Sequence, residues 1–81
     1  MQYVYLIQAD KYHKIGIAGD PQTRLAQLQT GNPYQLKIVS CYGFQDALIV
    51  EKSLHQAYSK FNVRNEWFLL HDDLISKFDD I

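Results

Sequence analysis

Two alternating runs decide the fold of this chain: Tyr3-Val-Tyr-Leu-Ile7 and Tyr12-His-Lys-Ile-Gly-Ile-Ala18. In each run successive side chains alternate between the two faces of a β-strand; Tyr3, Tyr5 and Ile7 fall on one face, and Val4 and Leu6 on the other. A short polar loop, residues 8–11, joins them. The sequence therefore predicts an antiparallel hairpin at the start of the chain.

The expected register of this hairpin pairs Ile7 with the first residue of the second run. It sets Tyr5 opposite Lys14 and Tyr3 opposite Gly16. Directly opposed residues share a face of the sheet, with Cβ atoms about 5 Å apart. We therefore expect the Tyr5 phenol and the Lys14 ammonium group to be neighbours.

A helix follows the hairpin. Asp20 is expected as its N-cap, Pro21 takes the first helical position, and Gly31 ends the helix after Thr30. The later expected elements are a third strand at residues 36–42, a second helix at 46–60, a turn at 62–65, an extended segment at 66–70 and an acidic C-terminal helix within 71–81.

The second helix has a recognisable apolar face. The residues that recur at helical spacing are Ala47, Val50, Leu54, Ala57, Tyr58 and Phe61. Glu51 lies roughly 70° from the centre of this stripe at about 100° per residue. We expect its carboxylate at the margin between core and solvent, with His55 one turn further on.

Length and composition limit the class of protein. The 81 residues suffice for one domain, 47% of them are apolar and 21% are charged, so an ordered globular domain is expected. The chain has no apolar run of membrane-spanning length and no secretion signal at its N-terminus, so we expect a soluble, cytoplasmic protein. The single cysteine, Cys41, forms no internal disulfide and is expected as a small core residue.

Charge is unevenly distributed although the net charge is only −1. Residues 1–70 hold seven basic and five acidic side chains, and residues 71–81 hold four acidic and one basic. A mildly basic body beside an acidic tail is compatible with a phosphate-binding face, but it supports that reading weakly.

Five short motifs occur along the chain in this order: Lys14-Ile-Gly16, Arg24-Leu25, Leu28-Gln-Thr-Gly-Asn-Pro33, Glu51-Lys-Ser-Leu-His55 and Glu66-Trp-Phe68. The order resembles the small phage-type branch of the GIY-YIG nuclease superfamily, with Tyr3-Val-Tyr5 in place of the first name-giving motif and Lys-Ile-Gly in place of the second. The resemblance implies an α+β fold, in which a small three-stranded antiparallel sheet is flanked by helices. It also implies one divalent metal, Mg²⁺ or Mn²⁺, held by Glu51.

The same resemblance implies roles for four further residues. Tyr5 would take part in proton transfer from the attacking water, and Arg24 would stabilise charge on the phosphate. Lys14 replaces a tyrosine of the superfamily; it would lower the pKa of the neighbouring phenol, contact the phosphate or act as a base. His55 would hold a phosphate or transfer a proton.

Each of these residues also has a purely structural interpretation: a packed strand aromatic, a solvated strand lysine or an exposed helical side chain. Glu66 has two interpretations, support of the site and a structural role; the structural role is favoured, with Trp67 and Phe68 closing the core.

The sequence thus favours a metal-dependent DNA endonuclease domain that cuts one strand per active site. Double-strand cleavage would need a homodimer or two successive nicks, and target choice would need a separate DNA-targeting partner. The alternative is a non-catalytic nucleic-acid-binding or protein-interaction module on the same fold, which the near-neutral charge and the lysine in the second motif both favour.

Overall fold

The computed structural model describes residues 1–80. The elements in chain order are β1 (Gln2–Ala9), β2 (Tyr12–Ala18), α1 (Pro21–Gln29), β3 (Leu36–Phe44), α2 (Ala47–Ala57), the 3₁₀ turn η1 (Ser59–Phe61), β4 (Asn62–Arg64), β5 (Trp67–Phe68) and α3 (Asp72–Phe78). The α+β class and the first helix are as expected. Asp20 caps α1, accepting a hydrogen bond from the backbone N–H of Thr23.

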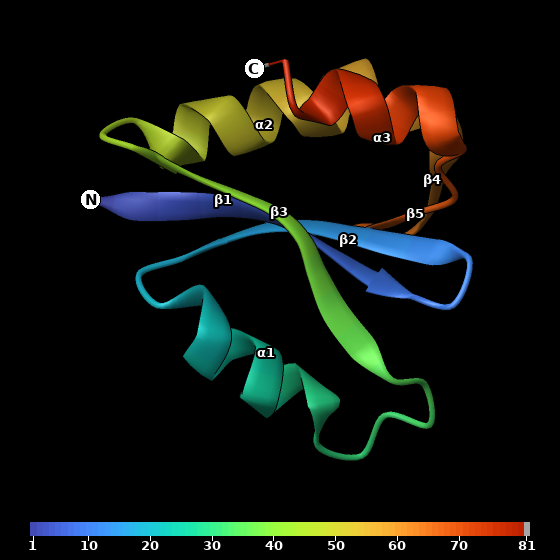
Figure 1. Cartoon of the computed structure of the whole chain (residues 1–81). Coiled ribbons are helices and arrows are strands. Elements are labelled where there is room, and N and C mark those ends of the chain that lie inside the picture. The colour runs from blue at the N-terminus through green and yellow to red at the C-terminus, as the bar shows by residue number, and fades with distance from the viewer. Residues whose placement is uncertain (81) are drawn as a thin grey trace.

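The sheet lies between two layers of helices (Figure 1). Its strand order is β3-β1-β2-β5-β4, and every neighbouring pair is antiparallel. Helices α2 and α3 cover one face, and α1 covers the other. None of these helices has the length and hydropathy needed to cross a lipid bilayer.

The expectation of a three-stranded sheet was wrong, because the sheet has five strands. The turn expected at residues 62–65 is part of a short hairpin of β4 and β5 that adds to the edge of β2. Asn65 adopts a positive φ of 52°, which asparagine tolerates better than most residues. The Asn62 amide braces the turn by donating to the carbonyls of Asn65 and Trp67.

The register of the first hairpin also differs from the expected one. Tyr5 pairs with Gly16, and Lys14 pairs with Ile7. The loop is shorter than assumed: Ala9 pairs with Tyr12, so Asp10 and Lys11 alone form the turn. A shift of two residues leaves each side chain on its face. Tyr5 and Lys14 therefore share a face as diagonal neighbours rather than as a directly opposed pair.

Each face of the sheet has its own core. On the α2 side the centre is formed by Val4, Leu6, Ile15, Leu54, Phe68 and Phe78. On the α1 side it is formed by Tyr5, Ile7, Ala9 and Leu36, with Leu25, Leu28 and Trp67 packed against them. The alternation read from the first two strands assigns these side chains to two opposite cores.

The buried face of α2 is rotated relative to the expected one. Ala47, Glu51, Leu54 and the C-cap Tyr58 are buried, whereas Ala57 is exposed. Glu51 was expected at the margin, but it lies on the buried face with 8% of its surface exposed. A carboxylate thus occupies a position that usually holds an apolar residue.

Two further expectations concern single segments. Cys41 lies in a strand as expected, but its side chain is exposed on the edge strand β3, so its assignment to the core was wrong. The C-terminal helix is shorter than the range 71–81: α3 spans Asp72–Phe78, and residue 81 lies outside the described residues. The hydroxyls of Ser40 and Tyr42 both donate to Asp79, tying the end of α3 to β3.

Gly16 cannot carry a side chain without displacing Tyr5. A methyl group there would overlap with the hydroxyl and ring of Tyr5, a buried side chain that has no room to move aside. We expect Gly16→Ala to lower the free energy of unfolding, measured in urea, by about 1–3 kcal/mol. Gly19→Ala is the matched control, since a methyl there meets no atom within 4 Å. Equal losses in both variants would contradict this explanation.

His13 is the one described side chain with buried polar atoms and no hydrogen-bond partner. It is 2% exposed, and neither ring nitrogen is bonded to another group within residues 1–80. Its ring borders a cavity of about 480 Å³ that Lys11, His71 and Asp72 also line. Burial lowers the pKa of His13, and the Asp72 carboxylate opposes this only in part.

Stability should therefore fall on acidification. Because the folded protein holds His13 at a lowered pKa, the unfolded chain binds more protons below about pH 6.5. The contribution of His13 is fully present above that pH and is lost as the pH falls, by at most about 1.4 kcal/mol per pH unit. We would measure the free energy of unfolding in urea at several pH values between 7.5 and 5. It should fall less steeply with decreasing pH in His13→Phe than in the control His71→Gln. Identical pH dependences in the two variants would show that folding does not lower the pKa of His13.

Candidate active site

The candidate site lies at the edge of β2 where strand pairing ends. β5 pairs only with His13 and Lys14, so the second half of β2 has no strand beyond it. The last backbone bond on this side runs from the N–H of Ile15 to the carbonyl of Glu66, at 3.1 Å. The Lys14-Ile-Gly16 motif therefore borders an open edge of the sheet.

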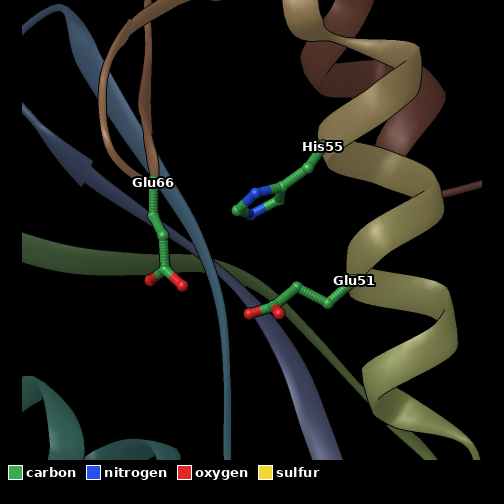
Figure 2. Close-up of side chains that lie close together, drawn as sticks. All are labelled: Glu51, His55 and Glu66. Atoms are coloured by element: carbon green, nitrogen blue, oxygen red, sulfur yellow. The ribbon is translucent and has the colours of Figure 1, made fainter.

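Three potential metal ligands converge beside this edge. One ligand atom from each of Glu51, His55 and Glu66 lies within 4.8 Å of the others. Figure 2 shows the three side chains pointing toward one another, Glu51 and His55 from α2 and Glu66 from the turn before β5. Glu51 and His55 are one helical turn apart, so the same side of α2 presents both of them.

The orientation of His55 is set by the backbone of β2. Its Nε2 lies 2.9 Å from the carbonyl oxygen of Ile15. A carbonyl oxygen can only accept, so Nε2 carries a proton, and Nδ1 is the nitrogen that has a free lone pair in the neutral tautomer. The ring also packs edge-on against Phe68, with centroids 5.2 Å apart. A histidine that ligates a metal through one nitrogen commonly donates from the other to a carbonyl or carboxylate, as His55 does here.

Lys14 is held at the same edge. Its Nζ donates to Oε1 of Glu66 at 2.6 Å, and it lies 6.0 Å from the centroid of the Trp67 ring. The Lys14 side chain is 10% exposed and that of Glu66 is 39% exposed, so this ion pair is partly shielded from solvent. Lys14 therefore supplies a positive charge beside the two carboxylates.

The pKa of Glu51 is raised above its ordinary value. The main cause is burial, and the negative charge of Glu66 adds to it. The positive charges of His55, Lys14 and Lys52 act in the opposite direction. A buried carboxylate beside a second one is unfavourable unless a cation binds between them. The site thus has the electrostatics of a cation-binding centre.

Tyr5 approaches the same motif from the α1 face. The atoms nearest to the missing side chain of Gly16 are the hydroxyl oxygen, Cζ and Cε1 of Tyr5. The phenol therefore extends from β1 across β2, in the direction of the open edge. Gly16 allows this crossing because it has no Cβ.

Arg24 is not joined to these residues by any described hydrogen bond or ion pair. It is exposed on α1, and within residues 1–80 its side chain bonds only to Gln27, at 3.4 Å. Of the five site residues predicted from the sequence, the structure brings Lys14, Glu51 and His55 together, places Tyr5 over Gly16 and leaves Arg24 in solvent.

Glu66 is the cluster member that the sequence did not assign to the site. Support of the site was the less favoured of its two interpretations, yet its carboxylate belongs to the cluster and pairs with Lys14. A signal was present: Asn65-Glu66 stands between Val63 and the aromatic pair Trp67-Phe68, and asparagine in such a position favours a tight hairpin turn. Because a two-stranded hairpin is only marginally stable alone, it would be expected to pack or pair with another element, and the structure shows that it pairs with β2.

A comparison with protein families finds one match. The model of the T5orf172 domain matches residues 2–79. The chain belongs to the T5orf172 domain family. This domain is found in phage-type endonuclease-like proteins. No curated protein and no solved structure matched the chain. All residues of the candidate active site named above lie inside the range matched by the T5orf172 domain.

Proposed function

We propose that this T5orf172 domain is a metal-dependent endonuclease of the GIY-YIG type that hydrolyses phosphodiester bonds in DNA. The observation that carries the proposal is the convergence of Glu51, His55 and Glu66 at the open edge of β2. Membership of a family found in phage-type endonuclease-like proteins supports the same reaction class. The order of the sequence motifs supports the GIY-YIG type.

The donor set fits a divalent cation. Two carboxylates supply oxygen ligands suited to Mg²⁺ or Mn²⁺, and the Nδ1 of His55 adds a nitrogen that Mn²⁺ accepts more readily than Mg²⁺. The carboxylate of Glu51 is nearly buried and accepts no hydrogen bond from residues 1–80, so its oxygens are available. A cation bound there would stabilise negative charge on the phosphate and favour ionisation of a coordinated water.

The remaining residues would manage the proton and the phosphate charge. The Tyr5 hydroxyl lies over Gly16 and has no hydrogen-bond partner in the described chain, so it is available to exchange a proton. Lys14 would offset negative charge on the phosphate, with Glu66 holding its ammonium group in place. Arg24 would contact the phosphate when substrate binds, because its exposed guanidinium would have to give up only one long hydrogen bond, to Gln27.

Cleavage of a supercoiled plasmid tests the proposal. We expect nicked circles in the presence of Mg²⁺ or Mn²⁺ and none in EDTA. Nicks should precede linear product, because one site cuts one strand, and linear product should then depend on protein concentration if a homodimer makes the second cut. Binding of DNA without cleavage under every metal condition would instead support the non-catalytic module. Cleavage of a single-stranded DNA and a single-stranded RNA of equal length and matching sequence shows whether DNA is preferred over RNA.

A further inference from the structure

A second cavity lies on the α1 face of the sheet, at the end next to the turn between β1 and β2. Its volume is about 350 Å³, which is in the range of small-molecule sites. The sheet contributes Tyr12, Arg64 and Trp67, and the loop between α1 and β3 contributes Asn32 and Tyr34. In Figure 1 this loop lies on the same side of the sheet as α1.

The cavity is walled by three aromatic rings on well-braced backbone. The amide of Gln29 donates to the Tyr34 carbonyl at 2.8 Å, and the Asn32 side chain accepts from the Tyr34 N–H at 2.9 Å. Trp67 is held between its strand partners Lys14 and Arg64. These contacts leave the cavity formed in the absence of a ligand.

Two positive charges lie next to the aromatic walls. Arg64 lines the cavity itself, and Nζ of Lys11, which lines the other cavity, lies 5.5 Å from the centroid of the Tyr12 ring. Trp67 connects the cavity with the candidate active site, because its ring also lies 6.0 Å from Nζ of Lys14, the partner of Glu66. Aromatic surfaces for stacking, together with cations for phosphates, are what single-stranded nucleic acid requires.

We infer that this cavity, which we name the Trp67 pocket, binds an unpaired nucleobase of a nucleic-acid strand that crosses the site formed by Glu51, His55 and Glu66. The inference rests on the proposed function for the identity of that strand. The base stacks against Trp67, Tyr12 or Tyr34, and Arg64 contacts an adjacent phosphate. Binding to an apolar stretch of protein is the competing use of such a pocket.

The inference gives the domain a preference among substrates. A base within a duplex must leave its stack to enter the Trp67 pocket, at a cost of a few kcal/mol that an unpaired base does not incur. Single strands, frayed ends and bulges should therefore bind more tightly than a fully paired duplex of the same length.

Trp67 is the only tryptophan of the chain, so its fluorescence reports directly on the pocket. We would titrate the full chain in EDTA, where binding is measured without cleavage. The probes are a short oligothymidylate, an abasic strand of equal length and a blunt duplex. Oligothymidylate should quench Trp67 and bind at least about fivefold more tightly than the abasic strand, as loss of base stacking implies.

One variant tests the stacking and a second serves as its control. Tyr34→Ala should weaken the binding of oligothymidylate by about fivefold to a hundredfold and leave that of the abasic strand nearly unchanged. Leu48→Ala is the control, because Leu48 is exposed on α2, on the opposite face of the sheet. Equal affinity for both strands in the wild type, or no change of Trp67 fluorescence with any oligonucleotide, would overturn the inference.

The outcome is distinguishable from that of the proposed function. Nicking of plasmid without any stacking signal would leave the nuclease proposal intact and remove the Trp67 pocket as a base site. A stacking signal that Tyr34→Ala abolishes, in a protein that never nicks DNA, would support the pocket and contradict the nuclease.

Discussion

Glu51→Gln is expected to abolish metal-dependent cleavage and, at the same time, to make the metal-free protein more stable. The carboxylate is 8% exposed on the buried face of α2, and the charge of Glu66 lies close to it. An amide of the same shape removes the charge without leaving a cavity. A gain on the order of 1 kcal/mol would raise Tm by about 4–8 °C in a domain of this size. Residues kept for function are often unfavourable for stability.

The two effects are measured by plasmid nicking and by thermal unfolding, each with and without Mn²⁺. The metal should raise Tm of the wild type and leave Tm of Glu51→Gln unchanged. At a free metal concentration of 100 times Kd, the free energy of unfolding of the wild type should rise by about 2.7 kcal/mol. Asp46→Asn is the matched control, because Asp46 is an exposed acid at the start of the same helix and its side chain makes no capping bond. Cleavage by Glu51→Gln at the wild-type rate would refute the assignment of Glu51 as a metal ligand.

Tyr5→Phe is expected to lower the cleavage rate by about 10²–10⁴-fold, the range for loss of a proton-transferring group. Folding should hardly change, because the hydroxyl has no hydrogen-bond partner in the described chain and the ring is retained. Affinity for Mn²⁺ should also be unchanged, since Tyr5 is not one of the clustered ligands. The loss should therefore appear in the rate constant of cleavage at saturating metal.

Tyr3→Phe serves as the control for this variant. Tyr3 precedes Tyr5 by two residues on the same strand and the same face, and it pairs with Ala18 beyond the Lys-Ile-Gly motif. It should cut DNA at the wild-type rate. If Tyr5→Phe did so as well, the phenol would be a packing group, and the Nδ1 of His55 or the Lys14 ammonium group would remain as candidates for the proton transfer.

The parts of the site that depend on residues close together in the sequence were predictable, and the parts that depend on tertiary packing were not. His55 and Glu51 lie four residues apart, so helical geometry alone put them on one side of α2. The degree of burial of Glu51 was missed, because Val50 and Ala57 suggested a stripe centred further round the helix than the one that Ala47, Glu51, Leu54 and Tyr58 form.

In the β1–β2 hairpin, too, one feature was predicted correctly and another was not. Alternation assigned Tyr5 and Lys14 correctly to one face, since that assignment survives any shift of an even number of residues. It did not decide which residues oppose each other, because the register depends on the turn. A two-residue turn at Asp10-Lys11 replaced the four-residue loop that composition suggested, and Gly16 rather than Lys14 came to lie under the Tyr5 phenol.

By itself the sequence determined the local elements: the two strands of the first hairpin, the capped start of α1 at Asp20-Pro21 and the helical turn that puts Glu51 and His55 on one side of α2. Those depend on residues within a few positions of one another. Only the tertiary structure decided that Glu66 reaches Glu51 and His55, and that Trp67 lies between this cluster and an aromatic pocket. Glu66 follows Glu51 by fifteen residues, and the two meet because the β4–β5 hairpin pairs with β2 while α2 packs across the same strand. Asn65 signals the hairpin turn itself, but no local signal shows that the hairpin pairs with β2 or that α2 packs across that strand. Strand pairing and helix packing over such separations are set by how the whole chain buries its two cores.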